Sequence, residues 1–191
     1  LLFDQNLSYK LCARLAELTE AQPPREFVSG ESFFYLGRRY RLRLVRGTAP
    51  RRKPVAVQNG RLVVTVTGTG HSAAQRRETR QYLIAWYQRR ARAIVPLRIT
   101  YYARKLRLVP PRLLIGDQRK RWGSCTARGE LRINWRIVMA PLALIDYVAA
   151  HELCHRRFHN HSARFWQLLG SVIPDYEARR ERLRRDGPAY W

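Results

Sequence analysis

The chain has 191 residues, of which 46% are hydrophobic and 11% aromatic, so it can build a core for one domain with an extension or for two small subdomains. No apolar run approaches the roughly 18 residues that a membrane span needs, which excludes a membrane-spanning helix within this sequence. The 37 Lys and Arg residues outnumber the 14 Asp and Glu residues, and the formal net charge is +23.

The positive charge comes almost entirely from arginine, since lysine occurs only at positions 10, 53, 105 and 120. Arginine suits bidentate contacts with phosphate, so the charge favours a non-specific DNA- or RNA-binding surface. The alternative is that the base composition of the source genome enriches arginine and that the charge has no partner. Basic residues are spread along the chain, and no cluster indicates a helix that reads a base sequence.

The first residues and the cysteines indicate in which cellular compartment the protein is expected. Leu1 to Gln5 show no basic segment followed by an apolar stretch, so we expect no signal peptide. Cys12, Cys125 and Cys154 make an odd number without zinc-ribbon spacing, which fits buried thiols in a reducing compartment better than disulfides. We therefore expect a cytoplasmic protein without a membrane partner.

Residues 6–21 have the pattern of a short helix. Leucines recur on one helical face at positions 7, 11, 15 and 18, and Pro23-Pro24 ends the pattern. We assign residues 1–26 to an N-terminal helical extension, residues 27–187 to the main domain and residues 188–191 to a C-terminal tail.

From Phe33 the hydrophobic period changes to that of strands. Phe33 to Leu36, a turn at Gly37, and apolar residues alternating with arginines up to Leu44 predict a half-buried hairpin. A second hairpin runs from Val55 to Val66 around Asn59-Gly60, which is a strong type I′ turn signal.

A long helix is expected next. Ser72 can cap it, and the apolar stripe continues to about Ile94. Pro96 is expected to kink the helix before a second segment at 98–108. Pro110-Pro111 marks the break before a strand at 113–120, and a further strand at 130–135 follows a turn.

Three helices are predicted in the last third of the chain. Pro141 lies near the first turn of a helix with Ile145, Val148, Ala149 and Leu153 on its buried face. Ser162 can cap a short helix that ends before Pro174. A basic helix over 175–186 ends at Gly187-Pro188. Hairpins followed by helices and a second small sheet indicate the α+β class.

The sequence His151-Glu152-Leu153-Cys154-His155 predicts a catalytic metal site. Positions i and i+4 share one face of a helix, so the two histidines can bind one metal ion. Glu152 is then placed to take a proton from an activated water molecule. A catalytic zinc has three protein ligands and an open position for water, so one further ligand is needed.

His161 is the favoured third ligand. His159 would continue the i, i+4, i+8 series, but eight residues of helix rise about 12 Å, which is too far for one ion with nitrogen ligands at about 2.1 Å. Asn160 can end the helix in a left-handed conformation, so that His161 swings back towards the metal. Glu177 or Glu181 would instead complete a set of two histidines and one glutamate.

Residues near the motif have supporting roles. Cys154 is expected to be core packing, since the two histidines already occupy the edge of the helix that faces the metal. Asp146 and Asn134 are candidate acceptors for histidine N–H groups.

Seven short blocks contain or surround the motif. In order they are Arg121-Trp122-Gly123-Ser124-Cys125, Asn134-Trp135-Arg136, Ala140-Pro141, Ile145-Asp146-Tyr147-Val148, His151-Glu152-Leu153-Cys154-His155, Asn160-His161-Ser162 and Phe165-Trp166. These blocks resemble the YgjP-like metallopeptidase family (the DUF45 group), and the hairpin at 35–40 resembles that family's N-terminal sheet. The resemblance covers residues 28–187 and leaves the 6–21 helix outside.

The resemblance implies a compact zincin-like metalloprotease fold, with N-terminal hairpins, a long helix, a small sheet and an active-site helix. It implies one zinc ion held by His151, His155 and His161, with Glu152 as the base. It also implies kinship with SprT-like and WLM proteases, which cut proteins crosslinked to DNA. The chain is not a standard metzincin, because Phe158 stands where metzincins carry Gly and the only Met lies upstream of the motif.

We therefore predict a zinc-dependent endopeptidase that acts on protein or peptide substrates, including those near or bound to nucleic acid. A strand near the cleft, either 113–120 or 130–135, could pair with an extended substrate. Arg121, Trp122 and Trp135 are candidate substrate-binding residues, although core packing is the commoner role of tryptophan.

Two rival functions remain. One is a nucleic-acid-binding module with a structural or vestigial zinc site, and the other is a metal-dependent nuclease. Glu152 argues against both, because neither needs a carboxylate directly after the first ligand.

Overall fold

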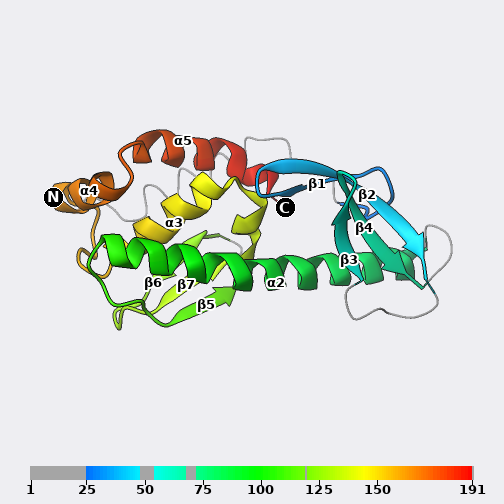
Figure 1. The fold of residues 1–191 in the computed structure, drawn as a ribbon, viewed down its shortest axis with the longest axis horizontal. Helices are drawn as coiled ribbons and strands as arrows, with labels where there is room; N and C mark the ends of the chain where they lie inside the picture. The colour runs from blue at the N-terminus through cyan, green and yellow to red at the C-terminus, as the bar shows by residue number, and fades with distance from the viewer. Residues whose placement is uncertain (1–24, 48–53, 68–71, 119, 191) are drawn as a thin grey trace.

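The computed structural model describes residues 25–47, 54–67, 72–118 and 120–190, so the predicted 6–21 helix lies outside the described residues. The helix α2 (Ala73–Lys105) runs along most of the molecule. A four-stranded sheet covers one end of α2, and a three-stranded sheet with helices α3 to α5 lies at the other end (Figure 1). These elements confirm the α+β class.

The four-stranded sheet is built from the two predicted hairpins. Its strands are β1 (Ser32–Tyr35), β2 (Arg38–Arg46), β3 (Val55–Gln58) and β4 (Arg61–Val66), in the order β1-β2-β4-β3. Asn59 and Gly60 both have positive φ, 46° and 71°, as a type I′ turn requires. The two hairpins join through the parallel pair β2 and β4. Both predicted hairpins are confirmed.

The helix α2 is continuous, and the prediction of two segments separated at Pro96 was wrong. Ser72 caps its start, where the hydroxyl accepts from the backbone N–H of Gln75 at 3.2 Å. Pro96 lies inside the helix, between the buried side chains of Val95 and Ile99. Burial of these neighbours stabilises the helix on both sides of the proline, so tertiary packing outweighs the local preference for a break.

Replacing Pro96 with Ala is expected to raise the free energy of unfolding by about 1–3 kcal/mol, because alanine restores a backbone N–H and removes the clash of the ring with the preceding turn. Denaturant unfolding measures this change. The control is Leu97→Ala, since Leu97 is 69% exposed on the same turn, and it should change stability by about 0.5 kcal/mol or less. Destabilisation by Pro96→Ala would contradict this account of the helix.

The second sheet contains β5 (Leu113–Gly116), β6 (Gly123–Cys125) and β7 (Leu131–Asn134) in the order β5-β7-β6. The strands predicted at 113–120 and 130–135 are present but shorter. The edge strand β6 was missed, because three residues that begin with Gly give no alternating pattern. It pairs antiparallel with β7, which leaves β7 at the centre of the sheet.

A short 3₁₀ helix, η1 (Trp135–Met139), leads from β7 to α3 (Leu142–Cys154) and joins the two ends of the molecule. The backbone N–H groups of Leu36 and Gly37, in the β1–β2 turn, donate to carbonyl groups of η1 at 2.8 and 3.0 Å. Gly37 has φ of 78°, and a Cβ there would lie 2.6 Å from Pro141, so a larger residue would separate the hairpin from α3.

The last elements are α4 (Ala163–Val172), α5 (Tyr176–Asp186) and η2 (Gly187–Ala189), close to the predicted bounds. Tyr190, which we assigned to the tail, is 6% exposed and contacts Phe34 and Trp122. Among the described residues, none of the helices is both long and apolar enough to cross a membrane.

Candidate metal centre

The helix α3 carries most of the predicted motif. Its first turns are held in the core by apolar side chains, including Leu144, Ile145 and Val148. His151 lies in its last turn and His155 at its C-cap, with ring centroids 4.9 Å apart. The rings share one face of the helix, as the i, i+4 spacing predicts.

After His155 the chain turns back and brings His161 to the same point. The N–H of Phe158 still donates to the carbonyl of Cys154 at 3.0 Å, and α4 then begins at the predicted N-cap residue Ser162. The Nε2 atom of His151 lies 3.2 Å from that of His155 and 3.1 Å from that of His161. His159 is exposed and is not part of this cluster.

The donor set fits a divalent cation. Two nitrogen ligands at about 2.1 Å from one zinc ion stand about 3.4 Å apart in a tetrahedral site, close to the spacing of these Nε2 atoms. Burial lowers the pKa of all three imidazoles, that of His161 to about 4, so each ring is neutral and offers a lone pair near pH 7. The three histidines could therefore hold a metal ion.

A backbone carbonyl fixes the orientation of His155. The Nδ1 of His155 lies 3.1 Å from the carbonyl oxygen of Phe158. A carbonyl only accepts, so Nδ1 carries the proton and Nε2 presents its lone pair to the cluster. The predicted acceptors are engaged elsewhere. Asp146 accepts from Arg98 of α2 at 2.9 Å, and the side-chain oxygen of Asn134 accepts from the backbone N–H of Arg136 at 3.0 Å.

Aromatic rings of α4 surround the histidines. The buried ring of Phe165 lies 4.7 to 4.9 Å, centroid to centroid, from all three imidazoles. Trp166 stacks on His161 at 5.3 Å, and Tyr176 of α5 also stacks on Trp166, at 5.2 Å. This packing restricts ring rotation and prepares the site for a metal ion. In the sequence, Phe165-Trp166 is one of the seven blocks of the resemblance, but neither residue was predicted to contact the histidines.

Glu152 follows His151 on α3, is buried and lies against Gly123 of β6. A Cβ at Gly123 would stand 2.6 Å from both Cγ and Oε1 of Glu152, so only glycine leaves room for this carboxyl group. Burial raises the pKa of Glu152 to about 8, and the positive charge of Arg121 acts in the opposite direction. A nearby metal cation would favour the carboxylate further.

Arg180 of α5 was missed by the sequence analysis. Its guanidinium lies 5.1 Å from the ring centroid of Trp166, and its charge contributes to the lowered pKa values of His151 and His161. This positive charge favours anionic groups at the rim of the cluster. No sequence pattern separates Arg180 from the other arginines of α5.

The candidate substrate-binding residues lie in different surroundings. Arg121 is exposed and close enough to Glu152 to affect its pKa. Trp122 is half-buried and contacts Gly187 and Tyr190 at the C-terminal end. Trp135 is 1% exposed and stacks on Tyr87 in the core, so we do not propose it as a substrate contact.

The two described cysteines are free, and Cys12 lies outside the described residues. Cys154 is fully buried, and burial raises its thiol pKa to about 12, which confirms a packing role. Cys125 of β6 is half-buried. Its thiol pKa is raised mainly by burial and also by the negative charge of Glu152.

Comparison with known proteins agrees with this site. A family model described as YgjP-like, metallopeptidase domain, matches residues 6–186. The match begins at residue 6, so it includes the 6–21 segment that we placed outside the resemblance. No curated protein and no solved structure matches the chain. Because the family match covers nearly the whole sequence, the chain belongs to the YgjP-like metallopeptidase family.

Proposed function

We propose that the protein is a zinc-dependent endopeptidase of the zincin type. In this proposal His151, His155 and His161 hold one zinc ion, and Glu152 is the general base. The observation that carries it is the convergence of three imidazoles, with the Nε2 atoms of His155 and His161 at 3.2 and 3.1 Å from that of His151, next in sequence to the buried Glu152. Exposed Glu177 and Glu181 have other partners, Tyr176 and Arg184, so we do not propose them as ligands.

A bound zinc ion would supply a Lewis acid that acidifies water and polarises the scissile carbonyl. Glu152 accepts the proton of the attacking water and then delivers it to the leaving amine. The close contact with Gly123 restricts the orientation of the Glu152 carboxylate, and its burial keeps it away from bulk solvent. The carbonyl of Phe158 keeps the proton of His155 on Nδ1, on the side away from the cluster.

We propose β6, rather than either predicted strand, as the strand that pairs with an extended substrate. The central strand β7 has neighbours on both sides, and β5 lies at the opposite edge. The carbonyl of Trp122, just before β6, accepts from the N–H of Asn134 in β7 at 2.8 Å, so by alternation the backbone groups of Gly123 and Cys125 point to the free edge. Gly123 also touches Glu152, which would bring a paired substrate next to the base.

The proposed function is tested by measuring cleavage of an unfolded protein before and after the metal is removed. We expect about one zinc ion per chain, cleavage of the protein into peptides, loss of cleavage with a chelator and recovery on adding zinc. DNA and RNA in the same assay test the rival functions. Cut nucleic acid with intact protein would support the nuclease, and zinc without any cleavage would support the binding module.

The Gly123→Ala change is expected to lower kcat/KM by about 10- to 100-fold, because the new methyl group would displace the Glu152 carboxyl group by up to an ångström. The matched control is Ser124→Ala on the same strand, since alternate strand residues face opposite sides of a sheet. Kinetics on a fluorogenic peptide and zinc content measure both variants. Equal activity of the two variants would contradict the proposed role of Gly123.

A further inference from the structure

Four arginines form a row on the outer face of the four-stranded sheet. On β2, exposed arginines alternate with inward-facing Tyr40, Leu42 and Leu44, and β4 adds one more arginine next to them. The arginine row consists of Arg39, Arg41, Arg43 and Arg61. Successive members on β2 lie about 6.7 Å apart, because side chains on one face of a strand repeat every second residue.

The arginine row has no negative charge beside it within the sheet. None of the strands β1 to β4 contains Asp or Glu. Within the described part of the chain, no ion pair involves a member of the row. Arg41 is aligned with Arg61 in the parallel pairing of β2 with β4, where neighbouring strands are about 4.8 Å apart. Adjacent like charges destabilise a sheet, so the row is arranged unfavourably unless an anion binds.

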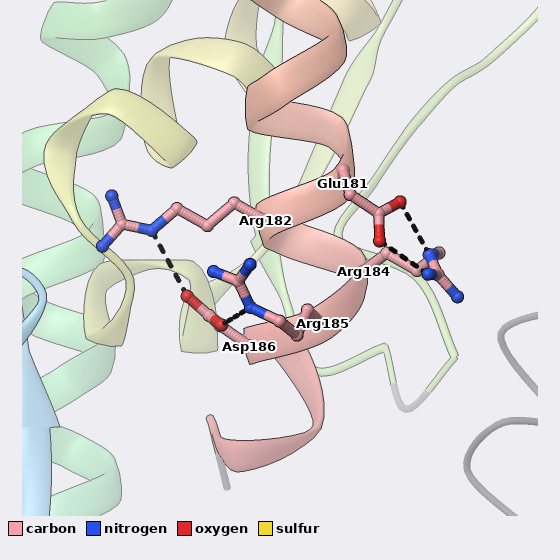
Figure 2. A network of polar contacts seen from close by, with 5 residues as sticks. All are labelled: Glu181, Arg182, Arg184, Arg185 and Asp186. Carbon is pink, nitrogen blue, oxygen red and sulfur yellow. Dashed lines mark hydrogen bonds and ion pairs between the residues drawn. The ribbon is translucent and has the colours of Figure 1, made fainter.

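The arginines of α5 have a different environment. Figure 2 shows that Arg184 pairs with Glu181 at 2.6 Å, and that Arg182 and Arg185 share Asp186 at 3.3 and 2.9 Å. A high arginine content alone does not leave arginines without acidic partners, because α5 has five arginines and four of them form ion pairs.

We propose that the outer face of the four-stranded sheet is a nucleic-acid-binding surface that contacts the phosphate backbone. Guanidinium groups bind phosphate with two hydrogen bonds, and a regularly spaced row of them suits a polymer with regularly spaced charges. The proposed contacts are to phosphates and not to base edges, and phosphate contacts carry no sequence information. Binding is therefore independent of base sequence and common to DNA and RNA.

Contacts connect the arginine row to the metal centre. The guanidinium of Arg39 lies 5.2 Å from the ring of Phe34, whose ring lies 5.5 Å from that of Tyr190. Tyr190 contacts Trp122, which directly precedes Gly123 of the edge strand. A nucleic acid on the row would be held on the molecule that carries the metal centre. The binding proposal itself does not depend on peptidase activity.

The test is equilibrium binding of the full chain to a short labelled DNA duplex, and to RNA of the same length, over about 50 to 200 mM salt. The test variant carries Arg39→Gln, Arg41→Gln, Arg43→Gln and Arg61→Gln. The control variant removes the same charge from exposed arginines of α2, for which the described residues show no ion pair. It carries Arg77→Gln, Arg80→Gln, Arg89→Gln and Arg92→Gln.

We expect the test variant to bind at least about tenfold more weakly near 100 mM salt, with a slope of log K against log salt smaller by about 3–4 for duplex DNA. The control variant should stay within about twofold of the wild type under the same conditions. Equal losses in the two variants would overturn the assignment to the sheet, and so would unchanged binding of the test variant. Binding of polyglutamate but neither nucleic acid would overturn the choice of partner.

Thermal unfolding separates loss of binding from loss of fold. Removing the charge of Arg61 relieves its repulsion with Arg41, so Arg61→Gln should leave the melting temperature unchanged or raise it. Added DNA should raise the melting temperature of the wild type more than that of the test variant. A lower melting temperature of the Arg61→Gln variant would contradict the repulsion between Arg41 and Arg61 on which the proposal rests.

Discussion

The Glu152→Gln variant is expected to lose about 10²- to 10⁴-fold in kcat/KM for cleavage of an unfolded protein, while it keeps the metal content of the wild type. Glutamine has the shape of glutamate and fits the same space against Gly123, but it cannot accept a proton from water. The fold should also be retained, because the carboxyl group is buried and its pKa of about 8 shows that the neutral form is tolerated in the metal-free protein.

The control for this variant is Glu177→Gln. Glu177 is exposed on α5, where its carboxylate accepts from the hydroxyl of Tyr176 at 3.2 Å. Cleavage and zinc content should both stay near the wild-type values. If Glu152→Gln retained more than a tenth of the activity, Glu152 would not be the base, since a general base contributes at least about 100-fold.

The parts of the fold that the sequence predicted well are those with strong local signals. A type I′ turn requires positive φ at both central residues, which Asn and Gly tolerate, so Asn59-Gly60 correctly predicted the turn of the second hairpin. Ser72 correctly predicted the start of α2, because its hydroxyl group can accept a hydrogen bond from the first turn of a helix. Pro96 led to a wrong prediction of a break, because the helix is held by the packing of Val95 and Ile99, which depends on distant parts of the chain.

In the candidate site, too, features with a local sequence signal were predicted, and features that depend on distant residues were not. The spacing of His151 and His155 predicts their common helix face. The return of His161 was also predicted, but the left-handed conformation expected at Asn160 was wrong. Asn160 is not among the described residues with positive φ, and α3 already ends at Cys154. The carbonyl of Phe158 could not be predicted, because a backbone acceptor leaves no mark in the residue type. The contact between Gly123 and Glu152 links two elements far apart in the sequence, and the edge strand that makes it is too short to give a pattern.

A second large effect is expected when the third histidine is removed. The His161→Ala variant should bind zinc at least about 100-fold more weakly, because losing a ligand should cost more than losing an outer hydrogen bond, which already costs 10- to 100-fold. Cleavage should be lost at zinc concentrations that saturate the wild type. Titration with zinc in competition with a coloured chelator measures the affinity, and added excess zinc should restore part of the activity.

The chain provides a closely matched control in His159→Ala, two residues away. His159 is exposed and lies outside the cluster of three, so its removal should leave zinc affinity and cleavage within about twofold of the wild type. The helix-rise argument against His159 and the return of the chain after His155 both depend on this contrast. A larger loss of zinc from His159→Ala than from His161→Ala would mean that the metal is bound along the extension of α3, and the proposed ligand set would then be wrong. Equal retention by both variants would instead point to a carboxylate as the third ligand, which zinc titration of Glu177→Gln and Glu181→Gln would then identify.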